Sequence, residues 1–318
     1  MIRTEFVREN IEIRIFGEVL TDYFVEKNLR VLGGAPLNFA AHVTRLLKIL
    51  GEEAPSIMLD TRVGNDPEGS QIINKIQSIG LDPRGIQVDK KYPTGLVSIT
   101  VDPNDLTKHE FTILPAAYDH MEPSKVKGKK AYPDLLYFGS LIQRHKDSRE
   151  TVRAAIEGAK DSIRFFDINL RKDSYSTEIL DWSLKHTDIL KINDDELREI
   201  NETFSISSAD ASLEDIVLAL SKSFNIPTVS VTEGSKGSFL LMNNQLVRTE
   251  IMPLTTSEIK DTVGAGDSYA AVLAIGILKG WTPEQIIDIA TDLASKICSI
   301  EGAIPSEDSP YKELNLPE

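Results

Sequence analysis

The chain has 318 residues, enough for one large α/β domain or two ordinary ones, and 41% hydrophobic residues allow a sizeable core. Its formal net charge of −14 argues against nucleic acid and anionic membrane surfaces as partners, because both attract Lys and Arg. The single cysteine, Cys298, excludes an intramolecular disulfide framework and a Cys-rich metal site. A charged start and short apolar runs favour a cytoplasmic protein without a signal peptide or membrane span.

The first part of the chain alternates between strand and helix patterns until residue 94, where this alternation stops. Two apolar runs at 95–101 and 108–114 flank a turn-forming sequence, which predicts an antiparallel hairpin. We expect this hairpin to join residues 18–32 in a small β flap over the main sheet. The elements expected before it are strands at 11–16 and 56–63 and helices at 40–50 and 69–79.

From residue 134 the alternation of strands and helices is regular. This pattern predicts a doubly wound, mostly parallel sheet with helices on both faces, in one domain spanning 1–318. In such folds ligands bind at the carboxyl ends of the strands. The expected strands are 135–138, 163–170, 188–192 and 227–232 with a hairpin over 237–242 and 245–251, and the expected helices are 148–160, 178–184, 194–200, 213–223, 265–279 and 283–300.

A glycine-rich turn at 261–267 opens the apolar helix that follows it. Gly264, Ala265 and Gly266 leave backbone N–H groups uncovered where the positive end of the helix dipole lies, an arrangement that favours an anion. Asp267 in the same turn has two interpretations. It is a helix cap, or its carboxylate takes a proton from a group that attacks a phosphate held in the turn.

Polar residues follow the expected strand at 163–170. Asp167, Asn169 and Arg171 share one face if the strand continues through them. A polar face is unexpected on a buried parallel strand, although a strand running out into a solvent-exposed loop explains it too. Arg171 is suited to gripping phosphate or carboxylate with two hydrogen bonds.

Two further strand ends have both an ordinary and a functional interpretation. Asn193 and Glu196 form a capping box in the ordinary interpretation, and act near a hydrated Mg²⁺ in the functional one. Thr232, Gly234 and Gly237 make a hairpin turn, or let the backbone approach a nucleotide phosphate. The sequence lacks a Walker motif and a G-x-G-x-x-G after its first strand, which disfavours P-loop and Rossmann proteins.

Near the start of the chain, Gly33 and Gly34 precede a helix that contains Asn38. They predict a turn and helix start, or a close-packed backbone beside a small polar ligand. Asn38 and Asp22 are then suited to hydrogen bonds with sugar hydroxyls. The five histidines lack metal-ligand spacing, so we expect them to be surface or core residues.

These pieces in this order resemble the ribokinase-like sugar kinases of the phosphofructokinase-B type over nearly the whole chain. Residues 33–38 through 64–69 resemble the family's N-terminal signature, and 261–267 resemble its C-terminal signature. Residues 193–196 resemble the N-x-x-E element, and 232–237 resemble the T-x-G-x-x-G nucleotide loop.

The resemblance implies phosphorylation of a sugar hydroxyl by ATP with Mg²⁺, under a β lid formed by roughly 18–32 and 94–118. Asp267 would be the catalytic base, and Arg171 would lie near the substrate or the transferred phosphate. By the same resemblance, Gly264, Ala265 and Gly266 would form an anion hole together with Asp267. Contacts to the nucleotide and to magnesium would come from Asn193, Glu196 (to the metal through water), Thr232, Gly234 and Gly237. Contacts to the sugar would come from Asp22, Gly33, Gly34 and Asn38.

Within the family, Gly-Gly-Ala-Pro at 33–36 and the Asp167-x-Asn169-x-Arg171 pattern are closer to fructokinases and 2-keto-3-deoxygluconate kinases than to ribokinases. We expect a fructokinase, with a sugar-acid kinase or a non-catalytic sugar- or nucleotide-binding paralogue as alternatives. After Asp267 the sequence departs from the usual Ala-Phe-x-Gly-Ala, which bears on helix packing. A lid with an apolar exposed face would support a homodimer.

Overall fold

The structure is a computed structural model of the 318-residue chain. It describes residues 10–53, 55–102, 105–123, 128, 130, 132–249 and 258–317, and only the backbone at 101, 102 and 105–111. Within these residues, no helix is long and apolar enough to cross a bilayer.

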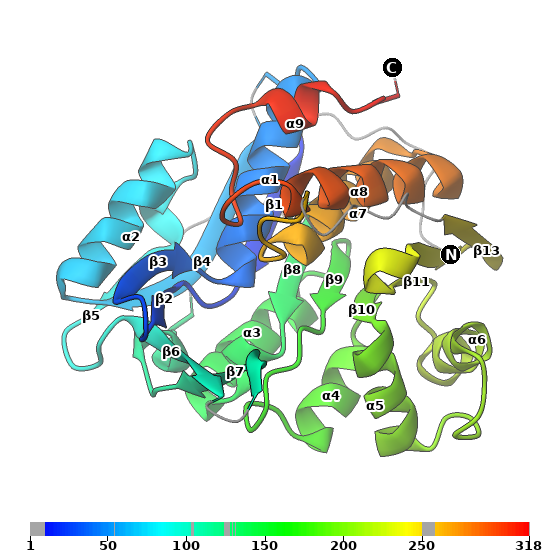
Figure 1. Cartoon of the computed structure of the whole chain (residues 1–318), viewed down its shortest axis with the longest axis horizontal. Helices are drawn as coiled ribbons and strands as arrows, with labels where there is room; N and C mark the ends of the chain where they lie inside the picture. The colour runs from blue at the N-terminus through cyan, green and yellow to red at the C-terminus, as the bar shows by residue number, and fades with distance from the viewer. Residues whose placement is uncertain are drawn as a thin grey trace.

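A nine-stranded sheet forms the centre of the molecule, in the order β13-β12-β11-β10-β9-β8-β1-β4-β5 (Figure 1). The strands from β11 to β5 pair in parallel, and β12 and β13 add an antiparallel edge. The strands are β1 (Glu12–Phe16), β4 (Ser56–Gly64), β5 (Ile86–Asp89), β8 (Leu135–Gly139), β9 (Ile163–Asp167), β10 (Ile189–Asn193), β11 (Thr228–Thr232), β12 (Ser238–Met242) and β13 (Gln245–Thr249).

Helices cover both faces of this sheet. One face carries α1 (Ala35–Ile49), α2 (Pro67–Ser78), α7 (Ala265–Lys279), α8 (Pro283–Cys298) and the short α9 (Ser309–Lys312). The other carries α3 (Lys146–Gly158), α4 (Thr177–Lys185), α5 (Asp194–Phe204) and α6 (Leu213–Phe224). Each face has its own apolar core, as expected for strands that are buried on both sides.

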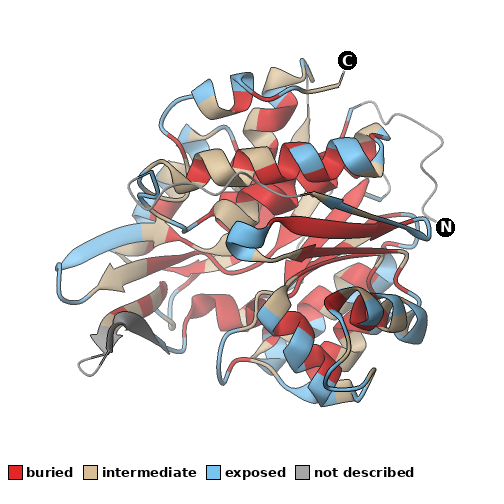
Figure 2. Ribbon diagram, turned by 45° about the vertical axis from the view of Figure 1, so that its right-hand side comes forward, coloured by how far each residue is buried: buried red, intermediate tan, exposed pale blue. Residues whose placement is uncertain are grey.

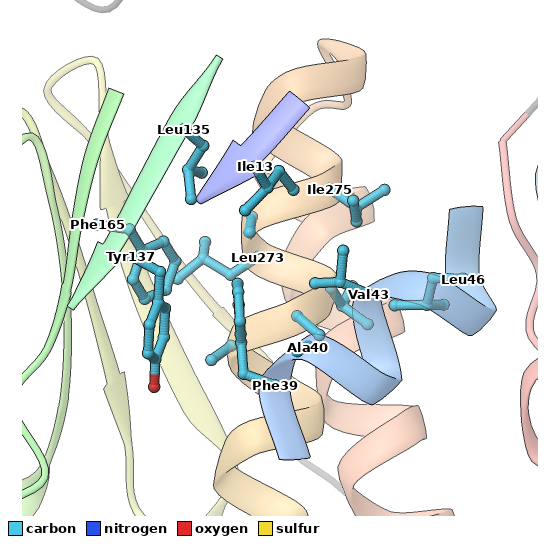
Figure 3. Packing of buried hydrophobic residues seen from close by; sticks show 14 of the residues in the cluster. Ile13, Phe39, Ala40, Val43, Leu46, Leu135, Tyr137, Phe165, Leu273 and Ile275 are labelled. Carbon is cyan, nitrogen blue, oxygen red and sulfur yellow. The ribbon is translucent and has the colours of Figure 1, made fainter. Parts of the chain in front are cut away.

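Helix α7 lies in the middle of the first core, and every residue from Ser268 to Leu278 is buried. Leu273 and Ile275 of α7 lie among side chains from α1 and the central strands (Figure 3). Phe39 of α1 stacks on Tyr137 of β8 with ring centroids 4.0 Å apart, and the Tyr137 hydroxyl points away from this cluster. The packing fixes the first turns of α1 and α7 over the carboxyl ends of the strands.

A second, four-stranded sheet has the order β3-β2-β6-β7. It is built from β2 (Leu20–Phe24), β3 (Leu29–Gly33), β6 (Gly95–Asp102) and β7 (Asp105–Ile113). The sheet projects from the main body, and β3 is largely exposed (Figure 2). Both segments that the sequence assigned to a β flap contribute to it, whereas Pro103 and Asn104 of the expected turn lie outside the described residues.

The largest differences from the sequence predictions concern element ends. The strand expected over 163–170 stops at Asp167, because Asn169 adopts a left-handed φ of 39° that no strand contains. Asp167, Asn169 and Arg171 therefore do not share one strand face. Helix α1 begins five residues earlier than expected, with Pro36 in its first turn.

Several short elements were not predicted as separate units. They are β2, β3, β5, α9 and the 3₁₀ helices η1 (Pro83–Gly85), η2 (Ala117–His120), η3 (Leu141–Gln143) and η4 (Gly234–Lys236). The prediction of a doubly wound, mostly parallel sheet with helices on both faces and a small additional β sheet is confirmed.

Candidate active site

The turn before α7 has the geometry of an anion site. Gly264 is the N-cap residue with φ 83°, a left-handed conformation that glycine adopts without strain. Its carbonyl accepts the N–H of Ser268 at 2.8 Å. The N–H groups of Gly266 and Asp267 donate to no other described residue, so they are available to a negatively charged group.

Asp267 lies in this turn, but it does not cap its own helix. The Asn38 side-chain amide of α1 donates to its carboxylate at 2.8 Å, and no N–H of the turn is found to donate to it among the described residues. Burial and the nearby Asp167 carboxylate raise the pKa of Asp267 to about 6, although Lys191, Asn38 and Arg171 oppose the shift. The capping interpretation is therefore insufficient.

Three buried polar side chains lie on adjacent strands, on the sheet face that α7 covers. Lys191 Nζ of β10 lies 3.1 Å from Asp167 Oδ1 of β9, and the Tyr137 hydroxyl of β8 donates to Asp167 Oδ2 at 3.1 Å. Burial works to lower the pKa of Lys191, but the carboxylates of Asp167, Glu196 and Asp267 outweigh it and raise the pKa. Lys191 is therefore a buried ammonium held by carboxylates.

Lys191 also reaches the glycine-rich turn. A Cβ placed on Gly266 would lie 3.1 Å from Lys191 Nζ, so the ammonium and the start of α7 are in close contact. The sequence analysis did not assign Lys191 to the site. The sequence feature that could have identified Lys191 is a charged residue inside an otherwise apolar strand. In the structure that strand is buried, and Lys191 is only 8% exposed.

A pocket opens beside these groups, over the carboxyl ends of β1, β8 and β9. Glu18, which follows β1, is 5% exposed, and its Oε2 has no hydrogen-bond partner among the described residues. Burial raises the pKa of Glu18 to about 7. The sequence analysis did not assign Glu18 to the site either. The pocket is lined by Glu18, Ala35, Pro36, Tyr137, Gly139, Ser140, Leu141, Asp167 and Asn169.

The two glycines before α1 are required by their neighbours. A Cβ on Gly33 would lie 2.5 Å from Asp22 Oδ2, and one on Gly34 would lie 2.6 Å from the Glu18 carbonyl oxygen. Gly34 also has a φ of 110°. Burial raises the pKa of Asp22 to about 6, and Arg171 opposes that shift.

Arg171 is exposed, yet its charge acts on Asp22, Glu18 and Asp267, where it opposes the rise in pKa that burial causes at each carboxyl. The residues assigned to the sugar and to the base therefore lie together around one end of the sheet, although they come from β2, α1, α7 and the loop after β9. Arg171 is found there without being on the strand face that the sequence pattern suggested.

Asn193 and Glu196 form the predicted capping box at the start of α5. The Glu196 N–H donates to Asn193 Oδ1 at 2.8 Å, and the Asn193 N–H donates to Glu196 Oε2 at 3.0 Å. The other Glu196 oxygen accepts the Leu170 N–H at 2.8 Å. Each carboxylate oxygen keeps one lone pair, which fits contact with a metal through water better than direct coordination.

Thr232, Gly234 and Gly237 make the turn between β11 and β12. Gly234 and Gly237 have positive φ values of 56° and 97°, and the Glu233 N–H donates to the Gly237 carbonyl at 2.9 Å. Thr232 pairs in register with Asn193. The loop therefore lies at the carboxyl end of the strand next to the capping box, and no interaction with Asp267 is found among the described residues.

Comparison with known proteins gives a consistent assignment. A profile of the pfkB family of carbohydrate kinases matches residues 24–310. An uncharacterized sugar kinase of Pyrococcus horikoshii is 30% identical over 292 residues, covering 84% of this chain and 83% of that protein. Its crystal structure in complex with ATP has a TM-score of 0.75 at 27% identity, covering 92% of this chain and 93% of that one.

Two fructokinases are similar along most of their length. The Klebsiella pneumoniae fructokinase is 27% identical over 295 residues, covering 90% of both chains. A Vibrio cholerae fructokinase structure with fructose, ADP and calcium has a TM-score of 0.77 at 22% identity, covering 96% of this chain and 99% of that one. The family profile covers most of the chain and agrees with the sequence motifs, and this protein therefore belongs to the pfkB family of carbohydrate kinases.

Proposed function

We propose that this carbohydrate kinase is a fructokinase, which transfers the γ-phosphate of ATP to a fructose hydroxyl with Asp267 as the base. The observation that carries the proposal is the position of the Asp267 carboxylate. It accepts a hydrogen bond from the Asn38 amide and belongs to the first turn of α7, where the N–H groups of Gly266 and Asp267 have no partner among the described residues. A carboxyl with a pKa of about 6 is ionised at neutral pH and still basic enough to take a proton from an attacking hydroxyl.

The turn before α7 supplies the charge stabilisation that phosphoryl transfer requires. The backbone amides of Gly264, Ala265, Gly266 and Asp267 would face the oxygens of the transferred group. Lys191, which lies against Gly266, adds a fixed positive charge behind the turn. We assign Lys191 to positioning: it neutralises Asp167 and keeps the Asp267 carboxylate ionised.

ATP and Mg²⁺ fit the donors on the neighbouring strand ends. Thr232, Gly234 and Gly237 would hold the nucleotide, because their turn leaves the backbone uncovered beside Asn193. Asn193 and Glu196 would act near the phosphates, with Glu196 reaching Mg²⁺ through water. The ion would supply neutralising charge for the phosphate oxygens.

The charges around the pocket favour a neutral sugar over a sugar acid. Glu18 and Asp167 line the pocket, and Asp22 lies against Gly33 nearby. A substrate carboxylate would meet these three acids. Of the two arginines that act on Glu18, Arg144 is already paired with Asp119 at 2.7 Å, and Lys191 is paired with Asp167 at 3.1 Å, which leaves Arg171 as the candidate partner. Asp22, Gly33, Gly34 and Asn38 would contact sugar hydroxyls, and Arg171 would lie near the transferred phosphate.

The small sheet would act as the lid over the sugar, since its first strand begins two residues after Glu18 and carries Asp22. A homodimer through the lid stays a prediction, supported by the exposed Leu29 and Val31 on β3, and sedimentation velocity tests it. A cytoplasmic location also stays a prediction of the sequence.

The test is ADP release from Mg²⁺-ATP with fructose, 2-keto-3-deoxygluconate, ribose and nucleosides as acceptors. Fructose should give the highest kcat/KM, and a higher value with the sugar acid would replace the fructokinase proposal by the sugar-acid alternative. Asp267→Asn should lower kcat by about 10²–10⁴-fold while ATP binding persists. Asp292→Asn, a change at a partly buried ion pair within α8, is the matched control. An active Asp267→Asn enzyme would refute the base assignment.

A further inference from the structure

A histidine from η2 meets a histidine and an aspartate from the start of α3 at the surface. His120 ends η2, His145 is the N-cap residue of α3, and Asp147 lies in the first turn of α3. One ligand atom from each lies within 4.8 Å of the other two. The sequence analysis treated these histidines as ordinary surface or core residues, because 25 positions separate them and no short spacing connects them.

The separations suit a small dication. His120 Nδ1 lies 2.8 Å from Asp147 Oδ2, and His145 Nδ1 lies 3.7 Å from the same oxygen. Tetrahedral Zn²⁺ with ligand bonds of 2.0–2.1 Å places its ligand atoms about 3.3 Å apart. The two observed separations bracket that value, so a metal ion requires only small rotations of the side chains.

The backbone that carries these residues is held in place independently of them. Ser148 Oγ donates to the Tyr118 carbonyl at 2.5 Å and accepts the Met121 N–H at 2.8 Å. Thr151 Oγ1 donates to the Met121 carbonyl at 2.9 Å. These buried bonds fasten η2 to α3 on both sides of His120, so the ligands are brought together by the fold before any metal binds.

One side of the cluster is also fixed by stacking. The Tyr92 ring stacks on His120 with centroids 3.7 Å apart, and the His145 ring lies 4.3 Å from His120 on centroids. His145 and Asp147 are exposed, which leaves access for the ion and for water in a remaining coordination position. Stacking limits the rotation of His120, and a ligand with few accessible orientations loses little entropy on coordination.

We propose that His120, His145 and Asp147 form a binding site for a transition-metal dication of the Zn²⁺ type, separate from the magnesium of the kinase reaction. Two imidazoles and one carboxylate match the ligand preference of Zn²⁺, whereas Mg²⁺ prefers an all-oxygen set. The bound ion would cross-link the end of η2 to the start of α3. The ordinary role of His145 is a weak cap, because its Nδ1 accepts the Asp147 N–H at 3.3 Å.

The test is isothermal titration of the untagged, chelator-treated protein with Zn²⁺, and separately with Mg²⁺. We expect one equivalent of Zn²⁺ to bind in the micromolar range and to raise the Tm, as any ligand selective for the folded state does. Co²⁺ bound at the same position should give the intense visible absorption of a tetrahedral or five-coordinate site. An excess of Mg²⁺ should leave the Zn²⁺ titration unchanged.

Variants locate the binding. His145→Asn keeps a side-chain cap for α3 but removes an imidazole, and Asp147→Asn removes the carboxylate. Each variant should weaken Zn²⁺ binding by at least about tenfold, because substitutions of residues that only support the metal ligands already cause a loss of that size. His186→Asn is the matched control and should leave Zn²⁺ binding unchanged, because the His186 ring hydrogen-bonds to the Trp182 carbonyl and stacks on the Trp182 ring at the end of α4. Equal Zn²⁺ affinity in His145→Asn, Asp147→Asn and the native chain, or no binding below millimolar Zn²⁺, would overturn the proposal.

Discussion

The Asn38 side-chain amide and the Asp267 carboxylate join the first turns of α1 and α7 through a 2.8 Å hydrogen bond. The two residues are 229 positions apart, and each lies in a helical first turn that follows a glycine with positive φ. Asn38 thus orients the proposed base, and it also stabilises the ionised form of that base because an N–H donor favours a carboxylate over a carboxylic acid.

Asn38→Ala should shift the pH dependence of the reaction. Asp267 must be ionised to accept a proton, so kcat/KM of the native enzyme should fall below about pH 6, the pKa of this carboxyl. Losing the Asn38 donor raises the pKa of Asp267 further and moves the acidic limb to higher pH. A pH profile of kcat/KM from 5 to 9 measures the limb, and an unmoved limb in Asn38→Ala would contradict the role given to this bond.

Glu18→Gln should stabilise the sugar-free protein at alkaline pH. The pKa of Glu18 is raised from the ordinary 4.5 to about 7, so the folded state binds more protons than the unfolded state between these values. The free energy of unfolding therefore falls as pH rises through this window, by up to about 3 kcal/mol from this group. A glutamine at position 18 does not titrate, so the variant does not lose this free energy of unfolding as pH rises. Urea unfolding at pH 5 and pH 8 should show the variant gaining on the native protein at pH 8 only; an equal difference at both pH values would contradict a buried, titrating Glu18.

The fold could be predicted well from the sequence because it depends on patterns among residues that are close together along the chain. Alternating strands and helices specify a doubly wound sheet, and the glycine-rich turn at 261–267 gave the start of α7 at Ala265. The unpredicted β2 and β3 are short, and β3 is largely exposed, so their hydrophobic pattern is weak. The left-handed Asn169, which ends β9 early, depends on a single backbone conformation that no pattern reveals.

The candidate site was predicted less completely, because part of it depends on tertiary contacts. Asp267 and the surrounding glycines carry a recognisable motif. The role of Lys191 can be recognised only when β9 and β10 pair in register and bring it to Asp167. The role of Glu18 can be recognised only when burial leaves its Oε2 without a hydrogen-bond partner among the described residues. Neither the strand register nor the burial can be read from the spacing of residues along the sequence.

Lys191→Met should destabilise the protein and inactivate it. Removing the ammonium leaves the Asp167 carboxylate buried without its ion-pair partner, which costs about 3–5 kcal/mol. Adding Asp167→Asn to Lys191→Met removes that charge and should restore most of the free energy of unfolding, measured by urea titration. Activity should stay low in the double variant, because the positive charge behind the turn is still missing. Recovery of activity along with stability would show that the pair is purely structural.

Gly266→Ala separates the anion site from the stability of α7. Alanine suits the first turn of a helix better than glycine, so the Tm should stay the same or rise slightly. The added methyl would lie 3.1 Å from Lys191 Nζ, so the ammonium must move by a few tenths of an ångström while it keeps its pair with Asp167, and the methyl would crowd the N–H groups of the turn. We expect kcat to fall by about 10²-fold, the loss typical of removing one donor from an anion hole. Gly158→Ala at the end of α3 is the matched control, because a Cβ there meets no atom within 4 Å, and its kinetics should equal those of the native enzyme. If Gly266→Ala keeps full kcat at unchanged Tm, the turn before α7 does not hold the transferred phosphate.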